Sequence, residues 1–217
     1  MTLAIFDLDE TLIAGDSASL WLEFLVRRKL ASAAILAQER ALMSAYYQGR
    51  MDMDAYMALT LSPIRHWQPA DLTPLVEEFI EQDIAPLVYP EARDRLDWHR
   101  RLGHELLIIS ATGEHLVRPI ARSLSVNHAI GIRLECCDGI YNGRTRGVYS
   151  YQEGKITRLQ EWLAEQRLAP ELTYGYSDSL NDLPLLEYVD RPTVINGGDH
   201  LARLAAERGW ANLRWRL

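Results

Sequence analysis

The chain has 217 residues, 48% of them hydrophobic and 24% charged, which is the composition of an ordinary globular protein. Its net charge of -7 argues against nucleic acid as a partner, because phosphate backbones require clustered Lys and Arg. No stretch reaches the roughly 20 apolar residues of a membrane span and no basic-then-apolar leader opens the chain, so we expect a cytoplasmic protein without a membrane partner. The adjacent cysteines, Cys136 and Cys137, are expected to be reduced, partly buried thiols.

The apolar residues 3–6 predict a buried strand close to the N-terminus. Asp7, Asp9 and Thr11 follow directly, at the end of the strand where α/β sheets bind their ligands. Because two acids so close together repel each other, a fold that keeps them neutralises them with a cation or protonates one of them. Taken alone, this stretch equally predicts a strand that runs into an acidic turn.

Residues 15–85 have a pattern that predicts helices only. Asp16 or Ser17 is a candidate N-cap for the first helix, in which apolar residues recur at helical spacing. Further helices are predicted over 31–47, from 52 or 54 to 61, and over 69–83, separated by breaks at 48–50 and at Ser62-Pro63.

From residue 86 onward helices alternate with strands. The predicted helices span 90–102, 113–124, 153–167, 179–187 and 199–208, and the predicted strands span 105–109, 129–134, 172–176 and, as the final strand, 193–196. A polar, hairpin-like segment is predicted over 138–149. This alternation predicts an α/β fold with a doubly wound parallel sheet. We expect residues 1–14 and 86–217 to form that core, with 15–85 as an inserted all-helical cap domain beside the ligand site.

Three further stretches place reactive polar residues at strand ends or helix starts. Ser110 follows a predicted strand and precedes a small-residue turn at a helix N-terminus, an arrangement that binds phosphate oxygens. Lys155 opens a helix, where the dipole disfavours a cation unless it serves a ligand. Asp178 ends a strand and Asp182 lies four residues later, so both carboxylates are able to approach one crevice. Each residue alone is equally a cap or a surface charge, but together they predict an active site.

The chain resembles the haloacid dehalogenase superfamily of phosphohydrolases in four ordered motifs, Asp7-x-Asp9-x-Thr11, Ser110, Lys155 and Gly175-Tyr176-Ser177-Asp178-x-x-Asn181-Asp182. The resemblance covers nearly the whole chain and implies a Rossmann-like core. A helical cap directly after the first motif is similar to the phosphoserine phosphatase-like branch. Within that branch, residues 129–135 and 153–155 resemble a histidinol-phosphatase-like subgroup.

The resemblance implies phosphomonoester hydrolysis through an aspartyl-phosphate intermediate. It makes Asp7 the nucleophile and Asp9 the general acid that protonates the leaving alcohol and then the base that activates water. It also implies a Mg²⁺ cofactor held by Asp7, Asp178 and the backbone carbonyl of Asp9. The remaining implied roles are phosphate binding by Ser110, Ala111, Lys155 and Asn181, and orientation of these groups by Thr11 and Asp182.

The cap is expected to choose the substrate, a small phosphorylated metabolite. Asp16 resembles the acid that engages the substrate amine in phosphoserine phosphatases, and it is equally a helix N-cap. The arginine that clamps the serine carboxylate in that branch should fall near Thr60, where this chain has none, and Arg65 is a candidate substitute. A missing clamp favours an amino alcohol phosphate such as histidinol phosphate. Aromatic residues that either face an imidazole or pack the cap helices together are Trp21, Tyr46, Tyr47, Tyr56 and Trp67.

Other functions stay open on this evidence. They are a phosphoserine phosphatase, a phosphotransferase that hands its phosphoryl group to an acceptor alcohol, and a non-catalytic regulator that binds Mg²⁺ and a phosphoryl group. The acid at position 9 favours hydrolysis, because a pure binder has no need of an acid–base group. Both a monomer and a homodimer are compatible with the sequence.

Overall fold

A single parallel sheet forms the centre of the molecule in the computed structural model, which describes residues 1–46 and 50–217. Its strand order is β3-β2-β1-β6-β7-β8. The strands span Thr2–Phe6 (β1), Glu105–Gly113 (β2), His128–Ile132 (β3), Leu172–Ser177 (β6), Arg191–Ile195 (β7) and Ala211–Leu213 (β8). Each neighbouring pair runs parallel, and Phe6 of β1 lies in register with Ile108 of β2 and Tyr176 of β6. The predicted fold class is confirmed.

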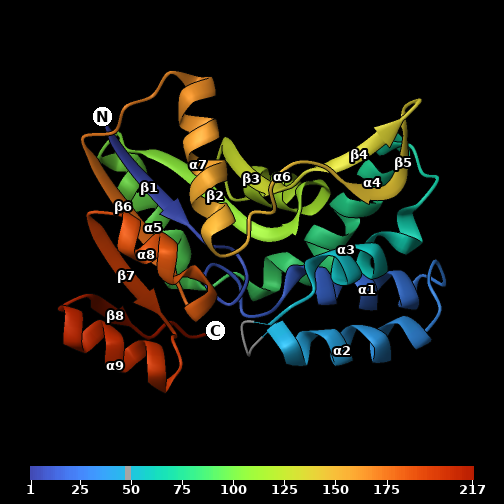
Figure 1. Cartoon of the computed structure of the whole chain (residues 1–217), viewed down its shortest axis with the longest axis horizontal. Helices are drawn as coiled ribbons and strands as arrows, with labels where there is room; N and C mark the ends of the chain where they lie inside the picture. The colour runs from blue at the N-terminus through green and yellow to red at the C-terminus, as the bar shows by residue number, and fades with distance from the viewer. Residues whose placement is uncertain (47–49) are drawn as a thin grey trace.

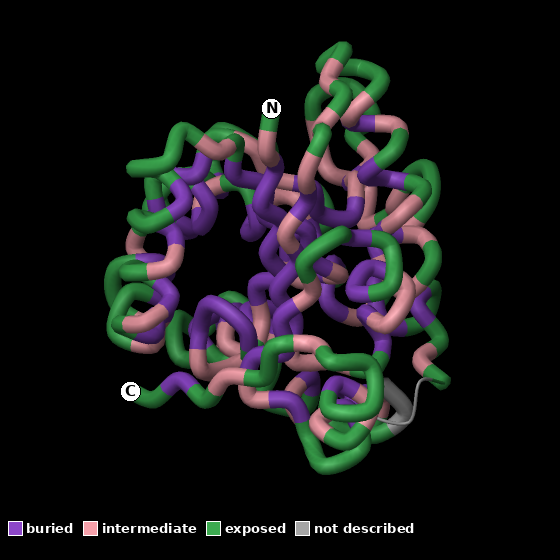
Figure 2. Tube along the Cα trace, turned by 90° about the vertical axis from the view of Figure 1, so that its left-hand side faces the viewer, coloured by how far each residue is buried: buried purple, intermediate pink, exposed green. Residues whose placement is uncertain are grey.

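Alternate residues of the central strands pack on opposite faces of the sheet, as the period of a strand requires. Phe6 belongs to a core cluster with residues of α5 (Pro90–Arg101) and α6 (Glu114–Ser123). Leu3 belongs to a second cluster with residues of α7 (Glu153–Gln166) and α8 (Leu183–Tyr188), and α9 (Asp199–Arg208) packs against β7 in a third. Helices therefore cover both faces (Figure 1), and the central strands are buried along most of their length (Figure 2).

The segment between β1 and α5 is helical, and we keep residues 15–85 of it as the proposed cap. Its helices are α1 (Ser17–Arg27), α2 (Ala34–Tyr46), α3 (Met53–Leu61) and α4 (Pro69–Phe79), followed by a π-helical turn over Ile80–Ile84 and short 3₁₀ turns over Ser62–Ile64 and Ala85–Leu87. Trp21 and Phe79 pack edge to face within it, with ring centroids 5.2 Å apart. The same hydrophobic cluster includes Leu8 and Leu12 of the loop after β1, so the insertion is anchored next to the first motif.

A β-hairpin extends from the core onto this helical insertion. It consists of β4 (Leu134–Cys137) and β5 (Ile140–Thr145), which pair antiparallel. The backbone N–H of His66 donates to the carbonyl of Tyr141 at 2.8 Å, and the N–H of Tyr141 donates to the carbonyl of Trp67 at 3.0 Å. The insertion thus contacts the core at the loop after β1 and at this hairpin, and also through α1 and α4, which pack against β2 and α6 (Figure 1).

Several predicted strand bounds were wrong. Residues 193–195 belong to β7, the last buried strand, as predicted, but an edge strand that was not predicted, β8, follows it, and the N–H of Asn196 donates to the carbonyl of Leu213. Three partly exposed residues carry too weak a pattern to predict it. Residues 129–134 form β3 and the start of β4, with a break at Arg133. β2 continues through Gly113 with a register shift against β3 after Ile109, where a turn was expected.

Helix bounds and one burial prediction also need correction. The predicted helix over 31–47 begins at Ala34, and its end at Tyr47 and the break at 48–49 lie outside the described residues. The predicted helix over 69–83 is α-helical only to Phe79. Both cysteines are exposed thiols, because the hairpin that carries them projects away from the core. None of the helices in the described part of the chain has the length and apolar character that crossing a membrane requires.

Candidate active site

The predicted site residues converge at the carboxyl end of the central strands. Asp7 follows β1 and Asp178 follows β6, and these two strands are neighbours in the sheet. The N–H of Asp7 donates to the carbonyl of Tyr176 at 2.9 Å, which fixes the backbone at the strand end. Ser110 lies in β2 on the other side of β1. The chain turns in opposite directions from β1 and from β6, so the site lies at the switch point where open α/β sheets bind ligands.

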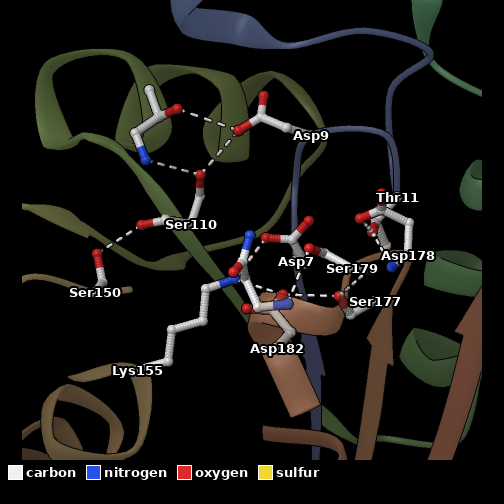
Figure 3. Close-up of polar contacts among 12 residues, drawn as sticks. Asp7, Asp9, Thr11, Ser110, Ser150, Lys155, Ser177, Asp178, Ser179 and Asp182 are labelled. Atoms are coloured by element: carbon white, nitrogen blue, oxygen red, sulfur yellow. Dashed lines mark hydrogen bonds and ion pairs between the residues drawn. The ribbon is translucent and has the colours of Figure 1, made fainter. Parts of the chain in front are cut away.

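Lys155 lies between two of the acids (Figure 3). Its Nζ donates to Oδ1 of Asp7 and to Oδ2 of Asp182, each at 2.7 Å, and the side chain is 2% exposed. Ser177 donates to the same oxygen of Asp182 at 2.7 Å. Burial alone would lower the pKa of Lys155, but the carboxylates of Asp182 and Asp7 reverse this and raise it, so the ammonium stays charged. Burial raises the pKa of Asp7 to about 7 against the opposing charge of Lys155.

A glycine places Lys155 in this position. A Cβ on Gly154 would lie 2.0 Å from the carbonyl oxygen of Tyr149, so only glycine lets the first turn of α7 lie against that loop. The cation at the start of α7 opposes the helix dipole. Its two buried carboxylate partners, Asp7 and Asp182, compensate for this.

Asp9 belongs to a separate hydrogen-bond network. Its Oδ1 accepts from the backbone N–H of Ser17 at 2.6 Å, and its Oδ2 accepts from the hydroxyls of Ser110 at 3.0 Å and Thr112 at 3.1 Å. Burial and the charge of Asp16 raise the pKa of Asp9 to about 6, while the hydrogen bonds from Ser17 and Ser110 oppose the rise. A carboxyl group that titrates close to neutral pH is suited to both donating and accepting a proton.

Thr11 orients the acid at the end of β6. Its hydroxyl donates to Oδ1 of Asp178 at 3.2 Å and accepts from the backbone N–H of the same residue at 3.1 Å. Burial, followed by the charges of Asp7 and Asp182, raises the pKa of Asp178 well above its usual range. The neighbouring carboxylates of Asp7 and Asp182 therefore disfavour the ionised form of Asp178.

The donor set fits a hard divalent cation. Within the part of the chain that the structure describes, four acids lie at the site, at positions 7, 9, 178 and 182, and the ammonium group of Lys155 pairs with only two of them, so carboxyl groups are in excess. Among the described residues, no three His, Cys, Asp or Glu side chains converge into a ready-made metal cage. A cation held by two carboxylates would complete its shell with a backbone oxygen and water, which is the coordination typical of Mg²⁺.

The remaining predicted residues are distributed unevenly around the site. Ala111 and Asp16 line a cavity of about 20 Å³ together with Asp7 and Asp9. Asp16 is also the N-cap of α1, because its carboxylate accepts from the N–H of Ser19 at 2.8 Å. Asn181 lies beside the Lys155 network, where its Oδ1 accepts hydrogen bonds from two residues of the loop before α7, Tyr151 and Gln152.

Thr60 and Arg65 were named in connection with the absent arginine that would bind a substrate carboxylate. The structure brings only Thr60 close to the site. Thr60 is buried, donates to the carbonyl of Met57 at 3.4 Å, and lines a second cavity next to the first. Arg65 is exposed and packs against Gly143 of the hairpin, so it lines neither cavity.

Four hydroxyl residues take part in the site although none of them was predicted as a site residue. They are Ser17, Thr112, Ser150 and Ser177. Ser17 forms hydrogen bonds with Asp9 and Thr112, and the hydroxyl of Ser150 donates to the carbonyl of Ser110 at 2.6 Å. All but Ser150 lie within two residues of a predicted site residue. For these three residues, the neighbouring motif was the signal that could have indicated a place in the site. Ser150 has no predicted site residue so close to it in the sequence.

Residues 4–187 match the family model of haloacid dehalogenase-like hydrolases. The chain belongs to this family. It is 38% identical to a histidinol-phosphatase of Neisseria meningitidis across 99% of both chains, and 32% identical to a phosphoserine phosphatase of Mycobacterium tuberculosis across 95% of this chain and 68% of that one. These relatives identify the chain as a phosphatase.

Solved structures share the fold of this chain. A protein of unknown function from Bordetella pertussis is 36% identical and superposes with a TM-score of 0.89, covering 98% of this chain and 97% of the other. A substrate-bound phosphoserine phosphatase shares the fold at 15% identity, with a TM-score of 0.67 over 93% of this chain and 89% of that one. The resemblance stated from the motifs is confirmed at the level of the family and the fold.

Proposed function

We propose that this phosphatase is a Mg²⁺-dependent phosphomonoester hydrolase that acts on a small amino alcohol phosphate through an aspartyl-phosphate intermediate. The observation that carries the proposal is the separation of the two acids of the first motif. Asp7 is bound to Lys155 at 2.7 Å, whereas Asp9 is bound by hydroxyl and amide donors. The two carboxyl groups thus have different partners, which supports a different task for each.

In the first step an oxygen of Asp7 attacks phosphorus, and the bond from phosphorus to the alcohol oxygen breaks. Lys155 keeps the attacking carboxylate in place and offsets charge on the transferred group. Asp9 gives its proton to the departing alcohol oxygen. In the second step Asp9 takes a proton from water as the water oxygen attacks phosphorus, which releases inorganic phosphate and restores Asp7.

The proposed Mg²⁺ ligands are the carboxylates of Asp7 and Asp178 and the backbone carbonyl of Asp9. When bound, the ion supplies charge stabilisation to the phosphoryl oxygens and offsets the repulsion between them and the acids. Support comes from the excess of buried carboxyl groups over cations in the site.

An amine on the substrate is supported by the acids of the insertion. Asp16 lines the catalytic cavity and accepts a hydrogen bond from the N–H of Ser19. The hydroxyl of Ser19 donates to the buried Glu39, so Ser19 connects the two acids. Burial raises the pKa of Asp16, and the charge of Glu39 adds to the rise. Among the described residues, no Arg or Lys lines either cavity, which disfavours a substrate carboxylate such as that of phosphoserine. The relative at 38% identity, named a histidinol-phosphatase, points to histidinol phosphate.

The test is phosphate release from histidinol phosphate, phosphoserine and phosphoethanolamine, each with Mg²⁺ and with EDTA. We expect histidinol phosphate to be the best of the three, EDTA to abolish turnover, and Asp7→Asn to be inactive yet folded. Rates that survive EDTA would remove the metal from the proposal, and phosphoserine as the best substrate would remove the amino alcohol. Adding an acceptor alcohol separates hydrolysis from phosphotransfer, because transfer lowers the yield of free phosphate per alcohol released.

A further inference from the structure

A second cavity adjoins the catalytic one, and no role has been assigned to it above. Its walls come from α1 and α3 of the insertion and from the end of β2 and the start of α6 in the core. It shares Tyr56 and Thr112 with the catalytic cavity. Thr112 donates to Asp9 at 3.1 Å, so the second cavity begins one side chain away from the proposed proton donor for the leaving group.

Three buried nitrogen atoms on residues that line this cavity have no hydrogen-bond partner among the described residues. They are Nε1 of Trp21 and both ring nitrogens of His115. Buried polar side-chain atoms in folded proteins nearly always have a partner. Trp21 is 1% exposed, and its ring meets that of His115 edge to face, with centroids 6.3 Å apart at 72°. Unpaired nitrogens gathered at one cavity indicate that a polar ligand completes it.

The available atoms define the chemistry of that ligand. Burial lowers the pKa of His115 to about 3, so its ring is neutral near pH 7 and offers one donor and one acceptor. The indole of Trp21 offers a second donor. Tyr56, Met57 and Leu116 contribute flat or apolar surface. This combination suits an uncharged planar ring that carries both a donor and an acceptor.

The cavity measures about 10 Å³, room for about one water molecule, as the structure stands. Because one wall belongs to the insertion and the other to the core, displacement of α1 and α3 from α6 enlarges it. Binding of a ring therefore requires that α1 and α3 stay displaced from α6 while the ring is bound.

We propose that this second cavity binds the side chain of the leaving alcohol, and that His115 and Trp21 select a neutral nitrogen heterocycle of the imidazole type by hydrogen bonding. The proposal rests on the proposed function, since it assigns the substrate of the same site. His115 and Trp21 are specificity residues and take no part in the transfer of the phosphoryl group.

The test compares histidinol phosphate with phenylalaninol phosphate, which has the same chain and a ring without nitrogen atoms. We expect the wild type to prefer histidinol phosphate by about 100-fold or more in kcat/KM, because a site built for hydrogen bonds rejects a ligand that leaves them unmade. His115→Leu and, separately, Trp21→Phe should each reduce this preference at least about tenfold. Phosphoethanolamine, which has the amine and no ring, should be hydrolysed by both variants within about twofold of the wild type.

His200→Leu is the matched control, because it makes the same replacement at an exposed histidine of α9 that lines neither cavity, and it should keep the preference. Equal losses on all three substrates would show that His115 and Trp21 only shape the fold, which overturns the proposal. A wild type without ring preference also overturns it. If no ester is hydrolysed, the proposed function fails, and calorimetric binding of histidinol against phenylalaninol still decides whether the cavity selects the heterocycle.

Discussion

The substitution Gly154→Ala adds one methyl group, which should displace Lys155 without changing the charge of any site residue. The added Cβ of Gly154→Ala would lie 2.0 Å from the carbonyl oxygen of Tyr149, and contacts below 3.0 Å essentially never occur, so the start of α7 must shift by about 1 Å. Lys155 follows immediately and moves with it. A displacement of about 1 Å in a catalytic group lowers rates by about 100-fold. Crowding of this kind costs about 1–3 kcal/mol of stability, or about 2–4 °C in Tm per kcal/mol for a chain of this length.

The assay is kcat on the best ester of the panel, together with thermal unfolding monitored by circular dichroism. Gly198→Ala is the control, because its added Cβ has no heavy atom within 4 Å and its φ of -62° suits any residue. We expect the control to keep kcat within about twofold. If Gly154→Ala also keeps kcat within about twofold while its Tm falls, the position of Lys155 does not depend on the contact with the Tyr149 loop and the reasoning is wrong.

Three further variants test the charges. Lys155→Met leaves two buried carboxylates without their cation, so urea unfolding at pH 7 should show a loss of about 3–5 kcal/mol, and a loss below 1 kcal/mol contradicts the ion-pair assignment. Asp9→Asn should slow the first step, measured as the single-turnover release of the alcohol, by about 10²–10⁴-fold on alkyl phosphates and far less on p-nitrophenyl phosphate, whose leaving group needs no proton; equal losses in this step would refute proton donation. His99, whose pKa is lowered to about 3 by burial and by the charges of His104 and Arg95, binds a proton only when the chain unfolds between pH 3 and 6.5. Stability therefore falls as pH falls through this window, by about 2 kcal/mol at pH 5 from this group, and His99→Gln should remove that loss in urea unfolding at pH 5 against pH 8.

The sequence predicted the parts of the fold that have strong local patterns. The run over residues 3–6 becomes β1 because four apolar side chains in succession suit a strand buried on both faces. By contrast, Ala211–Leu213 pairs with β7 through backbone groups, and its three side chains carry no alternation, so β8 was missed. Pairing at a sheet edge is a tertiary event that a three-residue pattern cannot encode.

The site shows the same division between local and distant determinants. Asp7 and Asp178 were predictable because each follows an apolar strand, and parallel strands bring their ends together. Thr112 was not, since its contact with Asp9 depends on β2 continuing past Ser110 with a shifted register. Ser150 reaches the carbonyl of Ser110 from 40 residues away, and only the packing of α7 brings the two together.

The helix α1 connects the chemistry to the choice of substrate. The N–H of Ser17, at its first residue, donates to Asp9, and the helix dipole favours the ionised form of a carboxyl group placed there. One turn further along, Trp21 lines the cavity proposed for the substrate ring. Because α1 belongs to the insertion, any movement that admits a ring also moves the donor that stabilises the Asp9 carboxylate.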